Sequence, residues 1–293
     1  MLPKEILAKI KKIQLKISRL SDEVISGQYV SAFKGAGMEF DEVREYIPGD
    51  DIRSIDWNVT ARAGSPFSKR YAEERELTVM LLVDLSGSQY FGTVNALKSE
   101  IAAEVSALIA FLAIKNNDKV GLLIFSDACE KYLPPQNGRF HVLRVIREIL
   151  GYQPSRTGTD IGQALEFASR VLKRRSVVFL ISDFREKDFA GPLQRLAKSH
   201  DLIAVRISDP REFELPAVGL LELQDNESGI RTVVDTSSPE VRAEFRMKAA
   251  EQWLRNSKML AARQVDLIEI TTDKSYLQPL QRFFSKRGHR RVR

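Results

Sequence analysis

Apolar residues recur along the chain in two patterns, and one of them covers everything from Leu77 onward. There, short continuous apolar runs alternate with longer stretches in which apolar residues recur at helical spacing. The runs predict buried strands at 79–83, 120–125, 177–181, 202–207 and 265–270. The stretches predict helices at 97–112, 140–150, 161–172 and from Ser238 onward. This alternation indicates an α/β fold built on a doubly wound, mostly parallel sheet.

The first 76 residues follow the other pattern. Within residues 1–26, apolar side chains repeat at helical spacing among lysines, which predicts an amphipathic N-terminal helix. Residues 27–76 alternate in EFDEVREY and DIRSIDWNV, which predicts short antiparallel strands in a small β-rich subdomain, with Trp57 in a core. The α/β domain then occupies 77–293 and includes an antiparallel hairpin near 219–235, where GLLELQD and IRTVVDT flank a short turn.

Composition and charge narrow the class of protein. Of the 293 residues, 43% are hydrophobic, which is enough for a sizeable core. The net charge of +6 reflects lysines and arginines gathered near both ends of the chain, and we expect these ends to be solvated, with the N-terminal helix docked on its own domain. The alternatives are that the basic N-terminal helix contacts a membrane surface peripherally, or that the basic ends bind nucleic acid.

The cysteine content and the apolar runs indicate in which cellular compartment the protein is expected. The single cysteine, Cys129, excludes an internal disulfide and fits a reducing compartment. Lysines interrupt every apolar run near the N-terminus, so we expect no signal peptide. The longest apolar stretch, residues 101–114, contains Glu104 and is shorter than the roughly 20 residues that span a bilayer. We therefore expect a soluble, cytoplasmic protein.

Oxygen-bearing side chains gather where predicted strands end. VMLLVDLSGSQYFG places Asp84, Ser86 and Ser88 directly after a buried strand, and Asp183 follows the run VVFLIS. RTGTDIGQAL adds a loop threonine, for which Thr157 is a rival but the phase to GQAL favours Thr159. Ligands of doubly wound sheets bind beyond the carboxyl ends of the strands, where these segments should meet. Hydroxyl and carboxylate oxygens suit a small, hard divalent cation.

The motifs of several enzyme classes are absent from the sequence. There is no GxxxxGK[ST] loop for phosphates and no GxSxG nucleophile elbow. Asp84 could be an aspartyl nucleophile, but position 86 is a serine where the DxD phosphohydrolases carry a second acid. GDDIRSIDW could bind a second cation or catalyse, although the nearby Arg44, Arg53 and Arg62 favour a structural ion-pair network. We therefore expect no enzymatic activity.

DLSGS, TGTDIGQAL and ISDF resemble the metal-ion-dependent adhesion site (MIDAS) of von Willebrand factor A domains, whose pattern is Asp-x-Ser-x-Ser, a loop threonine and an aspartate. The resemblance implies a von Willebrand factor A-like, Rossmann-like fold. It also implies that Ser86, Ser88 and Thr159 are direct or near-direct ligands, whereas Asp84 and Asp183 act mainly through bound water. The implied cation is Mg²⁺, with Mn²⁺ or Ca²⁺ as alternatives.

A second resemblance covers about residues 27–287. GAGMEFDEVREYIPGDDIRSIDWNVTAR, FSKRYAEERE and DPREFELPAVGLLELQD are similar to the bacterial domain of unknown function 58 family. Members of that family are commonly encoded beside MoxR-type AAA+ ATPases, which implies such a partner. Gln89 departs from the family pattern, in which a methionine often follows the second serine.

These observations lead to one main hypothesis and two alternatives. The main hypothesis is a non-enzymatic, metal-dependent protein-interaction module, an adaptor or co-chaperone that works with a MoxR-type AAA+ ATPase. A carboxylate of the ATPase or of its client would complete the coordination of the cation. The alternatives are a hydrolase that uses the same cation as a Lewis acid, and a basic protein that binds nucleic acid or a membrane surface.

Overall fold

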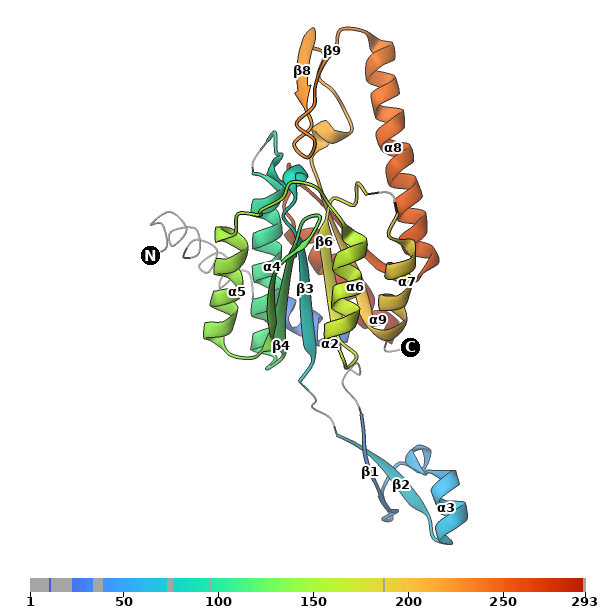
Figure 1. Cartoon of the computed structure of the whole chain (residues 1–293). Helices are drawn as coiled ribbons and strands as arrows, with labels where there is room; N and C mark the ends of the chain where they lie inside the picture. The colour runs from blue at the N-terminus through green and yellow to red at the C-terminus, as the bar shows by residue number, and fades with distance from the viewer. Residues whose placement is uncertain are drawn as a thin grey trace.

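A six-stranded sheet forms the centre of the molecule (Figure 1). The structure, a computed structural model, describes residues 11, 23–33, 39–72, 76–94, 96–186 and 188–291. The sheet has the order β10-β7-β6-β3-β4-β5. Its strands are β3 (Thr78–Asp84), β4 (Lys119–Phe125), β5 (Cys129–Gln136), β6 (Val177–Ser182), β7 (Asp201–Ser208) and β10 (Asp266–Thr271). All neighbours are parallel except the β4–β5 pair, which confirms the predicted α/β fold with a mostly parallel sheet.

The strand order makes the sheet doubly wound. From β3 the chain adds β4 and β5 on one side, and then returns to add β6, β7 and β10 on the other. Crossovers on the two sides of β3 therefore run in opposite directions. Such a reversal opens a crevice beyond the carboxyl ends of the two strands that flank it, here β3 and β6.

Helices cover both faces of the sheet (Figure 1). One face packs against α2 (Glu23–Phe33), α4 (Lys98–Lys115), α5 (Arg139–Gly151) and α9 (Leu277–Arg291). The other packs against α6 (Ile161–Val171), α7 (Ala190–Ser199) and the carboxyl end of α8 (Pro239–Ala262). Successive residues of β3 alternate between the two cores: Leu81 faces the first and Leu82 the second. This double burial explains why the strand reads as a continuous apolar run.

Three elements of this domain were not predicted from the sequence. Strand β5 lies at the sheet edge and contains Pro134 and Pro135, a composition that argues against a strand unless the strand is at an edge. Helices α7 and α9 were also missed. α9 carries many charged residues, yet it buries Phe284 against Tyr29 and Phe33 of α2.

Residues 39–72 form an arm at the end of the domain opposite the hairpin (Figure 1). Strands β1 (Glu39–Glu45) and β2 (Phe67–Ala72) pair antiparallel, and between them lie the 3₁₀ turn η1 (Ile52–Ser54) and helix α3 (Trp57–Ala63). The strand predicted for DIRSIDWNV is therefore wrong, because Asp56 caps α3 by accepting hydrogen bonds from the backbone of Asn58 and Val59. Trp57 is 66% exposed, so the prediction that it belongs to a core is also wrong.

The N-terminal boundaries differ from those expected. Residues 27–33 continue helix α2 instead of opening the β-rich subdomain, which begins at Glu39. Helix α2 docks on the domain through the Tyr29 and Phe33 rings, both buried. Apart from residue 11, the amphipathic helix predicted before Glu23 lies outside the described residues. Within the ranges that are described, no helix combines the length and apolarity needed to cross a membrane.

A hairpin stands beyond the carboxyl end of the sheet, over the span where a hairpin was expected (Figure 1). Its strands are β8 (Leu220–Gln224) and β9 (Arg231–Asp235), which pair antiparallel in a two-stranded sheet of their own. The chain then enters α8, whose N-cap Ser238 accepts a hydrogen bond from the backbone N–H of Val241 at 3.3 Å. The turn of the hairpin reaches back to the edge of the central sheet.

Candidate functional site

Strand β3 delivers Asp84 to the carboxyl edge of the sheet with its side chain fully buried. The carboxylate is held on two sides. Its Oδ1 accepts the backbone N–H of Ser86 at 2.9 Å, and its Oδ2 accepts the hydroxyl of Ser182, at the end of β6, at 2.6 Å. The side-chain amide of Gln89 lies 3.5 Å from the same Oδ2. These contacts join the ends of β3 and β6, the two strands between which the direction of the crossover connections reverses.

The two serines of the DLSGS segment lie side by side. The hydroxyl oxygens of Ser86 and Ser88 are 3.1 Å apart, and Ser86 is fully buried. Between them, the backbone N–H of Gly87 donates to the carbonyl of Thr157 at 2.7 Å. That bond ties the loop after β3 to the threonine loop before α6, so the two segments meet as the sequence predicted.

Asp183 lies after β6 and is paired with a lysine that sequence reasoning missed. The fully buried ammonium of Lys98, at the start of α4, lies 2.7 Å from Asp183 Oδ2 and 2.6 Å from Glu212 Oε1. Burial alone would raise the pKa of Asp183, but the charge and hydrogen bond of Lys98 outweigh it, so the pKa is lowered. In the sequence, the one feature that could have pointed to Lys98 is its position next to the apolar stripe of the predicted helix at 97–112.

Asp84 has no such cation among its described contacts. Burial, and then the nearby negative charge of Asp183, raise the pKa of Asp84 to about 7, against the opposing hydrogen bonds from Ser182 and Ser86. Glu186, in the loop after β6, also has its pKa raised to about 7, first by burial and then by the charges of neighbouring acids that include Asp160 and Asp84. The site is therefore an acidic environment in which carboxylates disfavour one another's ionisation.

Thr159 and Thr157 both contact the hairpin turn, through different groups. Thr159 Oγ1 donates to the carboxylate Oε1 of Glu227 at 2.8 Å, whereas Thr157 Oγ1 donates to the backbone carbonyl of Glu227 at 2.9 Å. Burial, followed by the charge of Asp183, raises the pKa of Glu227, and hydrogen bonds from Thr159 and Ser88 oppose that shift. The structure thus connects all five predicted residues, and it adds Glu227, which the sequence placed only in a turn.

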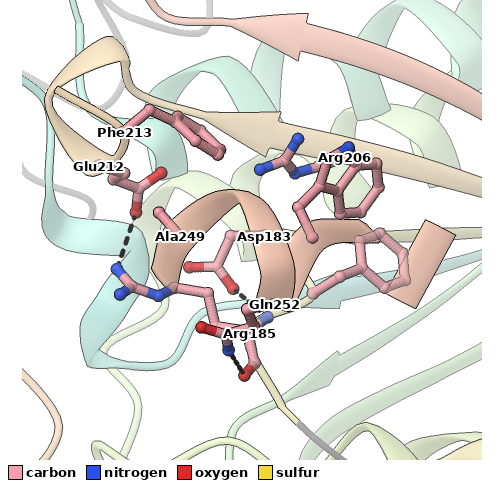
Figure 2. A pocket seen from close by; sticks show the side chains of 9 residues that line it. Asp183, Arg185, Arg206, Glu212, Phe213, Ala249 and Gln252 are labelled. Carbon is pink, nitrogen blue, oxygen red and sulfur yellow. Dashed lines mark hydrogen bonds and ion pairs between the residues drawn. The ribbon is translucent and has the colours of Figure 1, made fainter. Parts of the chain in front are cut away.

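A small pocket adjoins Asp183 on the side of helix α8 (Figure 2). The guanidinium of Arg206 lies between two aromatic rings, 3.7 Å from the centroid of Trp253 and 4.8 Å from that of Phe213. Arg185 pairs with Glu212 at 3.4 Å and receives a hydrogen bond from Gln252 of α8 on its carbonyl. These contacts fasten α8 to the loop after β6, and so to the segment that carries Asp183.

The acids of the GDDIRSIDW segment have structural roles in the arm. Asp50 pairs with Arg44 at 2.7 Å, Asp51 caps η1, and Asp56 caps α3. Of the expected ion-pair network, the structure describes the Asp50–Arg44 pair, and Asp56 pairs with Lys69 instead of one of the three arginines. The acids of this segment therefore act mainly as caps of η1 and α3. Asp209, after β7, likewise caps the 3₁₀ turn η3 (Pro210–Glu212) and accepts hydrogen bonds from Thr93 and Thr272.

The donor set at the sheet edge is rich in hydroxyls. Across the described part of the chain, no group of three or more His, Cys, Asp or Glu side chains is gathered as in many metal centres. The cluster instead combines two aspartates with three hydroxyl side chains and the carboxylate of Glu227, all of them hard oxygen donors of the kind that Mg²⁺ prefers.

The chain belongs to the family described as Protein of unknown function DUF58, whose profile matches residues 42–255. Uncharacterized protein Rv1480 of Mycobacterium tuberculosis is 32% identical over 286 residues, which cover 97% of this chain and 90% of the relative. Uncharacterized protein YeaD of Bacillus subtilis is 28% identical over 107 residues, 36% of this chain and 25% of the relative. The resemblance to this family is therefore confirmed.

Solved structures with a similar arrangement include BatB, a conserved hypothetical protein from Bacteroides thetaiotaomicron, with a TM-score of 0.44 at 17% identity over 73% of this chain and 99% of that one. A von Willebrand factor type A structure from Catenulispora acidiphila has a TM-score of 0.35 at 14% identity over 64% of this chain and 44% of that one. The assignment of the fold as a doubly wound α/β domain follows from the strand order and directions described above.

Proposed function

We propose that this protein is a non-enzymatic protein-interaction module whose recognition site holds a divalent cation at Asp84, Ser86, Ser88, Thr159 and Asp183. The observation that carries the proposal is the 3.1 Å separation of the Ser86 and Ser88 hydroxyl oxygens. Two neighbouring ligands of an octahedral Mg²⁺ with bonds of 2.0–2.1 Å lie about 3 Å apart. Both hydroxyls can therefore address one small cation without rearrangement of the loop.

The charges around the site also favour a cation. Lys98 is already engaged with Asp183 Oδ2 and Glu212, whereas the fully buried Asp84 has hydrogen-bond donors but no cation among its described contacts, and it faces the negative charge of Asp183. Gln89 beside it has an amide oxygen that is buried without a hydrogen-bond partner among the described residues. A cation that carries bound water would compensate the Asp84 charge and supply a donor to such an acceptor.

The roles of the residues follow from their contacts. A bound divalent cation would supply an electrophilic centre for a carboxylate oxygen. Ser86 and Ser88 would hold it directly, because their hydroxyl oxygens lie 3.1 Å apart. Thr159 would join them as a third hydroxyl ligand, because Thr159 and Ser88 both donate hydrogen bonds to the same carboxylate, that of Glu227. Asp84 is oriented by Ser182 and by the backbone of Ser86. Asp183 is oriented by Lys98 on its Oδ2 and by the backbone N–H of Arg185 on its Oδ1, and its carboxylate also accepts a hydrogen bond from Ser88. The two carboxylates would act mainly through bound water.

The partner we propose is a MoxR-type AAA+ ATPase or a client of that ATPase, which presents an acidic side chain. Family membership supports this proposal, through the resemblance noted above. A test measures the affinity of a purified MoxR-type ATPase for this protein in Mg²⁺ and in EDTA. We expect binding that is lost in EDTA and in Asp84→Ala. Equal affinity in all three cases would contradict the metal-dependent mechanism.

The burial of Asp84 argues against its acting as an aspartyl nucleophile. Both of its oxygens accept hydrogen bonds, and its side chain has no exposed surface, so it is poorly disposed to attack a substrate. Of the basic residues near the C-terminus, Arg287 is paired with Asp201 and Asp266 and stacks on Phe33. That arginine therefore stabilises the fold and adds little to a nucleic-acid surface.

The test of the cation site is titration calorimetry of Mg²⁺ and Mn²⁺ into wild type and into the double variant Ser86→Ala/Ser88→Ala. We expect wild type to bind and the double variant to lose binding. Ser257→Ala is the matched control and should bind as wild type does, because the Ser257 hydroxyl donates to the carbonyl of Leu254 within α8 and takes no part in the site. Equal binding by the double variant would place the cation elsewhere, and no binding by wild type would contradict the proposed site.

A further inference from the structure

The turn of the β8–β9 hairpin presents Glu227 on a hydrogen-bonded backbone. Asp225 Oδ1 accepts the backbone N–H of Glu227 at 3.0 Å, and its Oδ2 accepts the hydroxyl of Ser228 at 2.6 Å. The N–H of Gly229, which has a φ of +73°, donates to the carbonyl of Asp225 at 2.7 Å. These bonds close a tight turn with Glu227 near its apex.

The turn is seated directly on the candidate cation site. A Cβ atom at Gly87 would lie 2.4 Å from the carbonyl oxygen of Asn226, so the close approach of the turn depends on glycine between the two serines. Thr157 holds the carbonyl of Glu227 from the other loop. Glu227 is half-buried, whereas Asn226 and Ser228 on either side of it are exposed.

The geometry points to Glu227 as a ligand that the chain itself supplies to the cation, in the coordination position otherwise available to a partner's carboxylate. The inference rests on the proposed cation site and adds a ligand to it. Glu227 Oε1 lies 2.8 Å from Thr159 Oγ1, again about the separation of two adjacent oxygens around an octahedral Mg²⁺. The carboxylate also interacts with Ser88 and faces the charge of Asp183. A cation between these groups would relieve the repulsion between the carboxylates.

The hairpin that carries Glu227 is built in a way that permits its release. It is a two-stranded sheet separate from the central sheet, and such hairpins are marginally stable alone. Leu220 of β8 and Val233 of β9 are 75% and 65% exposed, so its strands bury little apolar surface. A partner's acidic side chain would therefore bind by displacing Glu227, and the hairpin would regulate access to the site.

The experiment uses Mn²⁺ as the probe, because water-proton relaxation reports both its binding and the number of waters that remain on it. Wild type, Glu227→Gln and Glu222→Gln are titrated as chains of all 293 residues. Glu222 is the matched control, since it lies on the same hairpin and is exposed beside Arg231. We expect Glu227→Gln to bind Mn²⁺ about tenfold more weakly and to show greater relaxation for each bound ion, and Glu222→Gln to behave as wild type.

Each other outcome has a distinct meaning. If wild type binds Mn²⁺ and Glu227→Gln matches it in affinity and relaxation, Glu227 is not a ligand and the cation site itself stands. Tighter binding by Glu227→Gln would show that Glu227 obstructs the site, which also overturns the assignment. If wild type does not bind Mn²⁺, the proposed cation site fails, and this inference fails with it.

A second measurement follows the hairpin itself. Amide hydrogen exchange of residues 225–230 should slow when Mg²⁺ is added to wild type, because the cation would anchor the turn through Glu227. The same residues of Glu227→Gln should exchange at a rate that Mg²⁺ does not change. Equal protection of both proteins by Mg²⁺ would overturn the inference even if the cation binds.

Discussion

At the scale of single residues, the buried ammonium of Lys98 controls the electrostatics next to the candidate site. It has no exposed surface and contacts the carboxylates of Asp183 and Glu212, which come from the loops after β6 and β7. Breaking a buried ion pair by removing one partner is costly, because the remaining charges stay buried without compensation. Lys98 therefore holds three segments of the chain together at the edge of the sheet.

Replacement of Lys98 tests this role. We expect Lys98→Met to lower the free energy of unfolding by about 3 kcal/mol, because Asp183 and Glu212 would lose their shared counter-charge. Urea unfolding followed by circular dichroism measures the change. Lys248→Met is the control, since Lys248 pairs with Glu244 on the exposed surface of α8 and its replacement should leave stability nearly unchanged. A cost for Lys98→Met as small as that of the control would contradict this account.

Residue patterns predicted the candidate site better than its surroundings. Asp84, Ser86, Ser88, Thr159 and Asp183 could be chosen because each follows a strand or precedes a helix in an α/β pattern, and the structure brings them together. Lys98, Ser182 and Glu227 could not be chosen. Their roles depend on contacts across 68 to 98 positions of the chain, which no local pattern records.

At the scale of elements, helices α2 and α9 form a pair that local sequence did not reveal. The ring of Phe284 is fully buried, with its centroid 5.7 Å from that of Tyr29 and 6.1 Å from that of Phe33. Arg287 completes the interface through Asp201 and Asp266 at the opposite edge of the sheet from the hairpin. A charged helix near the C-terminus thereby fastens a helix from the N-terminal region.

Truncation of Phe284 measures the strength of this pairing. We expect Phe284→Ala to lower the free energy of unfolding by about 3–5 kcal/mol, because it leaves a cavity between α2, α9 and the sheet. Phe140→Ala is the control, since the Phe140 side chain is 89% exposed and its removal should change stability by at most about 0.5 kcal/mol. Thermal or urea unfolding of both variants would decide, and equal stability would contradict the docking of α2 on α9.

The arm illustrates where element prediction fails. DIRSIDWNV alternates like a strand, but Asp51 and Asp56 cap a 3₁₀ turn and a helix in which their carboxylates accept backbone N–H groups. Local capping therefore overrode the alternation. Trp57 is exposed because a two-stranded sheet with one short helix has too few residues to cover both faces of each element.

At the scale of the whole molecule, the candidate site and the arm lie at opposite ends of the central sheet (Figure 1). Asp118 lies at the arm end, just before β4, where its carboxylate joins two parts of the chain. Its Oδ2 accepts the hydroxyl of Tyr29 in α2, and its Oδ1 accepts the backbone N–H of Leu77, each at 3.0 Å. The Leu77 contact holds the chain where it returns from the arm to β3.

The titration of Asp118 gives a pH-dependent contribution to stability. Burial raises its pKa to about 6, against the opposing hydrogen bonds from Leu77 and Tyr29. The unfolded chain releases this proton near pH 4, so the native state binds more protons between about pH 4 and 6. Below about pH 4, Asp118 is protonated in both the native and the unfolded state and does not change the free energy of unfolding. Between about pH 4 and 6 the free energy of unfolding falls as the pH rises, because the native state must give up a proton that it holds more tightly.

Asp118→Asn removes this titration. Relative to wild type, we expect the free energy of unfolding of the variant to increase as the pH rises from 4 to 6, and the difference to stay constant above that range. Urea unfolding at half-unit pH intervals measures the two profiles. Parallel profiles across the window would show that Asp118 has an ordinary pKa in the folded protein.

The sequence by itself determined the five parallel strands of the central sheet, but not its antiparallel edge strand β5, and it determined the placement of five oxygen-bearing residues where those strands end. Both follow from local patterns. Buried strands are continuous apolar runs, and apolar residues in helices recur about every 3.6 residues. The carboxyl ends of parallel strands meet at one edge of the sheet. Only the tertiary structure decided that Lys98 neutralises Asp183 and that Glu227 faces Thr159. Those contacts depend on how α4 packs against the sheet and how the hairpin turn lies at its edge. The residues next to a lysine or a turn in the sequence do not indicate which distant residue it will contact in the fold.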